Sequence, residues 1–162
     1  MFVQNLRRRA AGRLSGESES GFTLVELLVV MLILGLLAAI AIPSFFNQRD
    51  KATDADAKAA VRTAQTAMET YATDNSGEYT DATADILDGI EETLTDADIQ
   101  LTDASGTAVT PDAASYSVAA VSGTDNIFAI NRASGGTVTY TCTDAGTAGC
   151  PGSGGGEGTW AE

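Results

Sequence analysis

Histidine is absent from the 162-residue sequence, and positively charged residues are scarce. Without histidine, and with a single pair of cysteines, the chain lacks the commonest general base near neutral pH and offers little support for a zinc site. Only 9 lysines and arginines stand against 22 aspartates and glutamates, so we expect no direct binding of nucleic acid. These shortages predict a protein that is not an enzyme and that has no catalytic residue, metal or cofactor.

Large apolar side chains are also scarce outside one segment. The hydrophobic fraction is 44%, but much of it lies in residues 22–46, and alanine makes up a good part of the rest. The folded core should therefore be small, and a small core needs support from a crosslink or from oligomerisation. The two cysteines, Cys142 and Cys150, come late and close together, which predicts a disulfide formed in an oxidising compartment.

The apolar segment is long enough to cross a membrane. The 20 residues from Leu27 to Phe46 carry no charge. As a helix they would span about 30 Å, the thickness of a bilayer's hydrocarbon core. Four arginines precede the segment, at positions 7, 8, 9 and 13. They predict a single pass with a cytoplasmic N-terminus and a translocated remainder.

Two simple explanations of this segment leave Glu26 unexplained. The first is an ordinary signal peptide cut after Ala39-Ile40-Ala41, which would leave a chain beginning at Ile42. The apolar run is longer than the usual 7–15 residues of such a signal. The second is a plain single-pass anchor. In both, the carboxylate of Glu26 lies at a costly position without a partner.

A third explanation gives Glu26 a partner. A cut after Gly21 would create a free amino terminus at Phe22, one helical turn from Glu26. The ammonium and the carboxylate then compensate each other within one chain or between neighbouring chains. Pairing between chains would also set their axial register, which is the best-attested use of a buried polar group.

The stretch GFTLVE at residues 21–26, followed by the uncharged run, resembles the type IV prepilin cleavage and methylation motif. Gly35 and Pro43 match a glycine and a proline common in that helix, and the resemblance covers about residues 15–80. It implies that a prepilin peptidase removes residues 1–21 and N-methylates Phe22. It also implies that the helices bundle into a filament core, in which the stretch between Gly35 and Pro43 loosens.

The helix should continue to about residue 74, where Asn75-Ser76-Gly77 is a stop signal. Asp54 and Lys58 are expected on its outer side as a favourable pair four residues apart. Its apolar stripe should face the rest of the protein. The residues of this stripe are spaced by 4, 3, 4 and 3: Ala57, Val61, Ala64, Met68 and Tyr71.

The sequence after residue 77 predicts a small sheet. Residues 84–94 suggest a short helix broken at Gly89, and alternating apolar residues predict three antiparallel strands, at 115–120, 126–132 and 137–142. One apolar face of this sheet should cover the helical stripe. The fold class is therefore α+β, with a long N-terminal helix packed against a small antiparallel sheet, as in type IV pilins. The expected Cys142–Cys150 link also resembles the disulfide-bounded C-terminal region of many pilins.

Two further features are the C-terminal tail and a group of nearby aspartates. The tail at residues 151–162 is too rich in glycine to order itself. Trp160 within it could serve as an adhesive tip, but we expect it to dock on the sheet or to lie exposed. Asp96, Asp98 and Asp103 carry oxygen ligands of the kind that calcium prefers, but their spacing does not match the twelve-residue calcium loop. We therefore expect an acidic surface there.

The predicted organisation follows: leader 1–21, membrane and filament-core helix 22–46, amphipathic helix 47–76, head 77–150 and flexible tail 151–162. The resemblance implies a homo-oligomeric filament, assembly machinery as partner, residence in the inner membrane before assembly, and an extracellular or periplasmic location afterwards. The late cysteines and acidic head favour a type IV pilus subunit serving adhesion, twitching motility or DNA uptake. The alternatives are a type II secretion pseudopilin, and a secreted or anchored binding module with an ordinary signal sequence.

Overall fold

The computed structural model describes residues 21–152 and 156–160 of the chain. The predicted leader at residues 1–20 and its arginines lie outside the described residues. The chain divides after Ile42 into two compact units. The described part of the first unit consists of residues 21–23 and the beginning of helix α2, and the second unit holds the rest of α2 together with all the strands found in the described residues.

Helix α2 runs from Leu24 to Asp74, close to the predicted limits, and Pro43 lies inside it. It stops where the sequence predicted, because Ser76 and Gly77 adopt positive φ angles of 64° and 89°. The Gly77 amide then donates a hydrogen bond of 2.7 Å to the carbonyl of Ala72, which satisfies one of the last carbonyls of the helix.

The predicted short helix is two elements. Helix α3 spans Ala84–Ile90 and is capped by Thr83, whose side chain accepts a hydrogen bond from the amide of Ile86. The 3-10 helix η1, Glu92–Leu94, follows. The two helices are separated at Glu91, whose backbone is extended.

Among the described residues, the sheet has five strands where three were expected. They are arranged in chain order, and every neighbouring pair is antiparallel. The strands are β1 (Ile99–Gln100), β2 (Tyr116–Val121), β3 (Ile127–Arg132), β4 (Val138–Cys142) and β5 (Gly158–Thr159). The three predicted strands are present as β2, β3 and β4. The two edge strands were missed because two residues are too few to show alternation.

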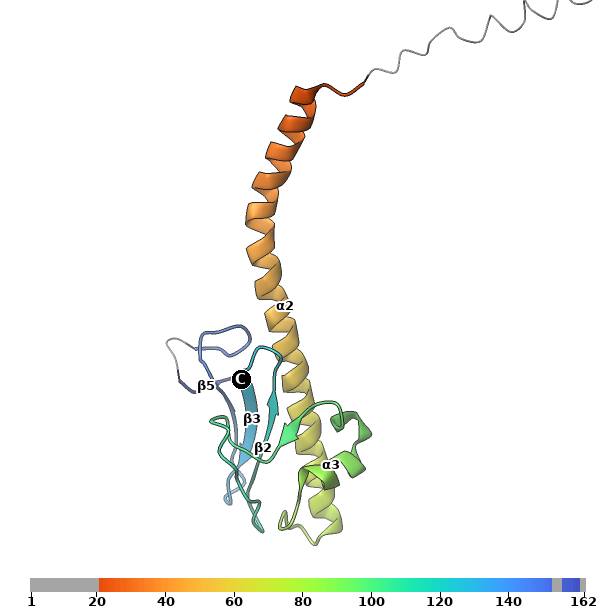
Figure 1. Ribbon diagram of the computed structural model, residues 1–162. Helices are drawn as coiled ribbons and strands as arrows, with labels where there is room; N and C mark the ends of the chain where they lie inside the picture. The colour runs from red at the N-terminus through yellow and green to blue at the C-terminus, as the bar shows by residue number, and fades with distance from the viewer. Residues whose placement is uncertain (1–20, 153–155, 161–162) are drawn as a thin grey trace, which may run out of the picture. The chain divides into compact units, whose positions relative to one another are not determined.

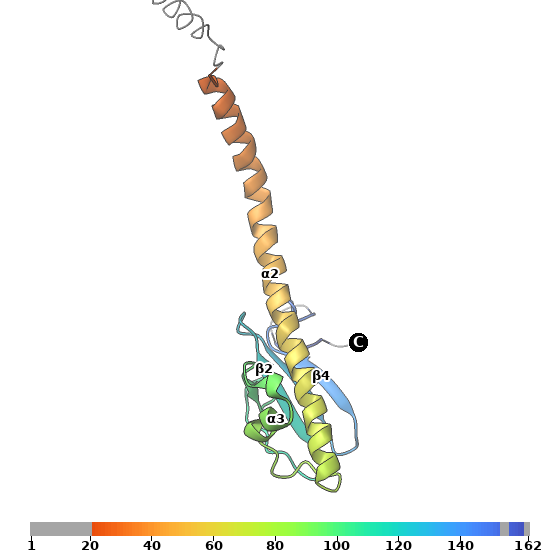
Figure 2. The same cartoon turned by 90° about the vertical axis from the view of Figure 1, so that its right-hand side faces the viewer.

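The second half of α2 lies against one face of the sheet (Figures 1 and 2), and the main core is formed by side chains between them. The predicted stripe is its helical side: Val61, Ala64 and Met68 are fully buried, whereas Tyr71 is only half-buried. Sheet residues that join the same core include Val118, Phe128 and Ile130. The α+β fold with a long apolar helix and a small antiparallel sheet is confirmed.

The opposite face of the sheet is not solvated in its centre. Ala119 and Ala129 form a second small cluster with Ala104, which lies in the loop between β1 and β2. Ser117 on this face donates a hydrogen bond of 2.7 Å to the carbonyl of Thr102 in the same loop. Strand β2 is therefore buried on both faces.

Candidate functional site

The predicted cleavage junction lies just before the first helical turn. Gly21 and Phe22 precede α2, and the Phe22 side chain is 78% exposed. A Cβ atom added at Gly21 would meet no atom within 4 Å. Packing against the described residues therefore does not require glycine at this position.

Glu26 occupies a helix-capping position. Thr23 Oγ1 accepts a hydrogen bond from the Glu26 amide at 3.2 Å, and the order Thr-x-x-Glu is that of a capping box. An acidic residue in the first turn also interacts favourably with the helix dipole. The Glu26 side chain is exposed, and in residues 21–152 and 156–160 the ion pair found joins other residues, Arg132 and Glu69. Its pairing with an amino terminus at Phe22 remains a prediction.

The apolar segment at residues 22–46 exposes its large side chains all round. From Phe22 to Phe46, each large hydrophobic side chain is between 48% and 78% exposed. Among the described residues, α2 is the one helix long and apolar enough to cross a membrane. Gly35 likewise has no atom within 4 Å of an added Cβ, and α2 continues through Pro43 in the single chain. The roles of Gly35 and Pro43 in assembly remain predictions.

Asp54 is the main departure from the sequence prediction. We expected it on the outer side of the helix, but it is fully buried and points into the head. Its carboxylate accepts hydrogen bonds from the residues of the β2–β3 turn and from the backbone amide of Gly149: Ser122 Oγ (2.5 Å), Thr124 Oγ1, Asn126 Nδ2 (3.0 Å) and Gly149 N (2.7 Å). Four donors satisfy a charge that burial alone would disfavour.

These hydrogen bonds decide the protonation of Asp54. Burial raises the pKa of the Asp54 carboxyl, but the hydrogen bonds from the turn and from Gly149 together outweigh it and hold the pKa below its ordinary value of 3.8. The group is therefore a buried anion. No signal in the local sequence marks it, because its donors lie 68 to 95 residues away.

The predicted disulfide is confirmed. Cys142 and Cys150 are bonded, with Cα atoms 5.9 Å apart. The loop that they close, residues 142–150, is fastened to α2 twice: through Asp54, and through Lys58 Nζ, which donates a hydrogen bond of 2.5 Å to the carbonyl of Gly149. Lys58 therefore faces this loop, where desolvation lowers the pKa of its ammonium group.

A second polar cluster fastens the far end of the sheet to α2. The carboxylate of Glu69 accepts hydrogen bonds from the hydroxyls of Tyr79 (2.8 Å) and Tyr116 (2.9 Å), and Arg132 lies 3.6 Å from it. Burial, followed by the Glu69 carboxylate, raises the pKa of both tyrosines, so they remain neutral donors. Two hydrogen bonds and one ion pair to Glu69 therefore join the sheet and the segment after α2 to the helix.

Trp160 is docked, one of the two outcomes that the sequence left open. It is 8% exposed, and its indole Nε1 donates a hydrogen bond of 2.8 Å to the carbonyl of Thr141. Its ring contacts Phe128 and Tyr140 edge-on, and the Arg62 guanidinium lies 5.1 Å from its centre. The tail was expected to be flexible, but here Gly158–Thr159 pair with β4 as β5.

The part of the chain that the structure describes holds no group of three or more histidine, cysteine, aspartate or glutamate residues placed to bind a metal ion. Asp103 instead turns inward on its own loop, accepting hydrogen bonds from the amides of Ser105 (2.9 Å) and Thr107 (3.0 Å). These bonds define a local turn.

Comparison with known proteins addresses the N-terminal motif directly. Residues 18–42 match the family model described as the prokaryotic N-terminal methylation motif. The chain is 40% identical over 57 residues to the type II secretion system core protein G of Pseudomonas aeruginosa, and 36% identical over 58 residues to that of Vibrio cholerae. It is also 41% identical over 51 residues to the type IV major pilin protein PilA of Myxococcus xanthus.

These similarities cover part of each protein. The match to core protein G of Pseudomonas aeruginosa covers 35% of this chain and 40% of that protein, the match to its Vibrio cholerae counterpart 36% and 40%, and the match to PilA 32% and 23%. No solved structure matches the chain. The predicted resemblance is nevertheless confirmed: the chain carries the N-terminal methylation motif, and over about its first third beyond the leader it is similar to type II secretion core protein G and to a type IV pilin.

Proposed function

We propose that this protein is a structural subunit of a helical filament, assembled from a membrane-anchored precursor. The observation that carries the proposal is the exposure of the apolar segment at residues 22–46, beside a head that has its own buried core. An exposed apolar surface of this size is unstable in water, so it needs a bilayer before assembly and neighbouring helices afterwards. The protein acts by assembling, and its polar clusters are structural rather than catalytic.

The filament that we propose is a type II secretion pseudopilus. Core protein G from two organisms matches this chain, and the matched segment covers a larger share of core protein G than of PilA. This reverses the preference for a surface pilus derived from composition. A surface pilus remains the second candidate, because the match to PilA has similar identity and the head carries a C-terminal disulfide.

The processing and assembly residues in this proposal are those of the motif. A prepilin peptidase cuts after Gly21 and methylates the new amino terminus of Phe22, which then pairs with Glu26 of a neighbouring subunit. Gly35 and Pro43 allow close packing and local loosening of the helix in the filament core. Before assembly, the N-terminus faces the cytoplasm and the head lies on the opposite, non-cytoplasmic side of the inner membrane.

The proposal is tested by mass spectrometry of the chain recovered from three fractions: membranes, periplasm and sheared surface material. We expect a chain that begins at N-methylated Phe22. Its accumulation in a cell-associated filament supports the pseudopilus, and its release by shearing supports the surface pilus. A chain that begins at Ile42 identifies an ordinary signal peptide and rules out both filaments.

Two variants separate processing from assembly. Gly21→Leu should leave the full-length chain in the membrane, because the peptidase no longer accepts the junction. Glu26→Ala should still be cut after Gly21 but assemble poorly, whereas Glu26→Gln, which retains capping geometry without charge, distinguishes a missing ion pair from a weakened helix start. Normal filament yield from Glu26→Ala contradicts the pairing.

A further inference from the structure

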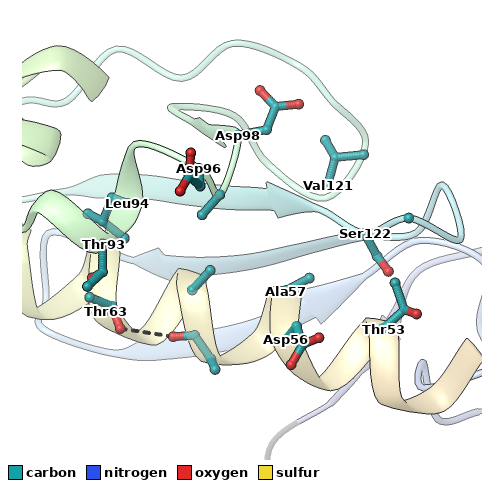
Figure 3. Close-up of a pocket in the computed structure, with 14 residues that line it drawn as sticks. Thr53, Asp56, Ala57, Thr63, Thr93, Leu94, Asp96, Asp98, Val121 and Ser122 are labelled. Carbon is teal, nitrogen blue, oxygen red and sulfur yellow. Dashed lines mark hydrogen bonds between the residues drawn. The ribbon is translucent and has the colours of Figure 1, made fainter. Parts of the chain in front are cut away.

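A groove lies along one flank of the head, between α2 and the segment that contains η1 (Figure 3). Its volume is about 460 Å³. Small apolar side chains form much of its lining, among them Ala57, Ala60 and Ala97, and the start of the β2–β3 turn at Ser122 and Gly123 closes one end. The groove is therefore open to a long, thin side chain from outside.

The charged residues of this groove have one sign. Asp56, Asp96 and Asp98 are among its lining residues and are exposed, and no lysine or arginine lines it. The ion pair found in the described residues joins Arg132 to Glu69 and involves none of these three acids. We call this feature the acidic groove. A cation that enters it would meet carboxylates unopposed by a neighbouring base.

A suitable cation lies on the other flank of the same helix. Lys51 is exposed, and it borders the disulfide loop at Gly146 and Ala148. At about 100° per residue, Lys51 and Asp56 point about 140° apart around α2. The lysine therefore points away from the groove of its own chain, and it is exposed on the opposite flank of α2.

We propose that the acidic groove of one subunit receives Lys51 of the next subunit in the filament. This inference rests on the proposed function, and it names the contact between heads that accompanies bundling of the helices. The contact joins two different flanks, which makes it heterologous, and a heterologous contact repeated by a non-closing operation builds an open helical filament.

The axial spacing supports the same pairing. If the amino terminus of Phe22 in one subunit pairs with Glu26 of its neighbour, the two subunits are shifted by about four residues, or about 6 Å. Subunits related by one screw operation share that axial shift at every residue. Where α2 runs along the filament axis, Lys51 is then level with residue 55 of the neighbour, next to Asp56 at the groove.

Charge reversal in the full chain tests the contact. In cells that assemble the filament, Lys51→Glu and the double substitution Asp56→Lys with Asp96→Lys should each lower the filament yield by about fivefold or more, because like charges then meet at every subunit contact. All three substitutions in one chain restore opposite charges and should recover most of the yield. Failure of the combined variant to recover overturns the proposal.

A control isolates the site. Glu78→Lys changes an exposed acid outside the groove. It should assemble like the unchanged chain. If Glu78→Lys lowers the yield as much as Asp56→Lys with Asp96→Lys, the effect is that of general charge on the head and the pairing is wrong.

A crosslink gives a readout that does not depend on yield. Chains carrying Lys51→Cys are coexpressed with chains carrying Asp56→Cys, and mild oxidation of the filaments should give a covalent dimer that requires both. Thr73→Cys in place of Asp56→Cys should give none. Filaments that form without this dimer overturn the groove contact alone, whereas absence of methylated Phe22 and of any filament from the unchanged chain overturns the proposed function.

Discussion

The carboxylate of Asp54 on α2 accepts a hydrogen bond from the backbone amide of Gly149 at 2.7 Å, which fastens the disulfide loop to the helix. The same carboxylate binds Ser122 of the β2–β3 turn at 2.5 Å. One buried anion therefore holds two loops that are distant in sequence. Because the apolar core is rich in alanine, these hydrogen bonds supply attachment that larger side chains would otherwise give.

Replacing Asp54 by alanine should destabilise the head by about 3 kcal/mol, because several buried donors lose their acceptor together. The measurement is urea denaturation of the full chain in detergent micelles, followed by the fluorescence of the single tryptophan, Trp160. Asp56→Ala is the matched control, since its side chain is exposed, and it should change the free energy of unfolding by less than about 0.5 kcal/mol. Equal effects of the two variants would contradict the role of Asp54.

The contribution of Asp54 should depend on pH. Its folded pKa lies below the unfolded value, so the unfolded chain takes up the proton first as the pH falls. The stabilisation is fully present above the unfolded pKa of about 4 and is lost as the pH falls through the folded pKa. The difference in unfolding free energy between the unchanged chain and Asp54→Asn should therefore shrink from pH 7 to pH 2. A constant difference would mean that Asp54 is not ionised when folded.

The disulfide should stabilise the chain in two ways. Closing a loop of sequence separation 8 contributes about 2.5 kcal/mol in the chain-entropy model. The bond also keeps Gly149 in place for Asp54 and Lys58. We therefore expect Cys142→Ser with Cys150→Ser to lower the free energy of unfolding by about 2.5 kcal/mol or more.

A double-mutant cycle separates the two effects of the disulfide. If the loop serves Asp54, removing the disulfide and replacing Asp54 by alanine should together cost about 1 kcal/mol less than the two separate losses combined. Urea denaturation of the four chains gives the coupling. Strict additivity would show that the loop stays on α2 without the crosslink.

Docking of the tail should be visible in fluorescence. The emission of Trp160 should be blue-shifted in the folded chain, because its ring is packed between Phe128, Tyr140 and Arg62. Trp160→Ala should destabilise the head by about 2–3 kcal/mol, measured by circular dichroism in urea. Thr159→Ala, whose side chain is exposed, is the control. An emission maximum typical of water-exposed indole would contradict the docked position.

The features that depend on consecutive residues were predictable from the sequence. Three features are patterns along the chain: the GFTLVE motif, the uncharged segment and the stripe that contains Val61 and Met68. The charge of Glu26 marks the motif, bilayer thickness sets the length of the uncharged segment, and the helix period sets the spacing of the stripe. The central strands β2, β3 and β4 were recognised for the same reason, since alternation over five or six residues reports which face is buried. The pairing of the two cysteines followed from their number and their close spacing late in the chain.

Tertiary structure decided what consecutive residues leave open. Asp54 lies near the edge of the helical stripe, and helical periodicity alone predicted that its carboxylate would be exposed to solvent. Its burial is favourable only because folding brings hydrogen-bond donors to it from residues 68 to 95 positions away in the sequence. Likewise, β5 forms in a glycine-rich tail because Trp160 finds a partner and a packing surface. The sequence by itself determined the apolar segment, the long helix and the three central strands, because these follow from local pattern. Only the tertiary structure determined three features: the inward orientation of the Asp54 side chain, the docking of the tail and the acidic groove. Each depends on residues that only folding brings together.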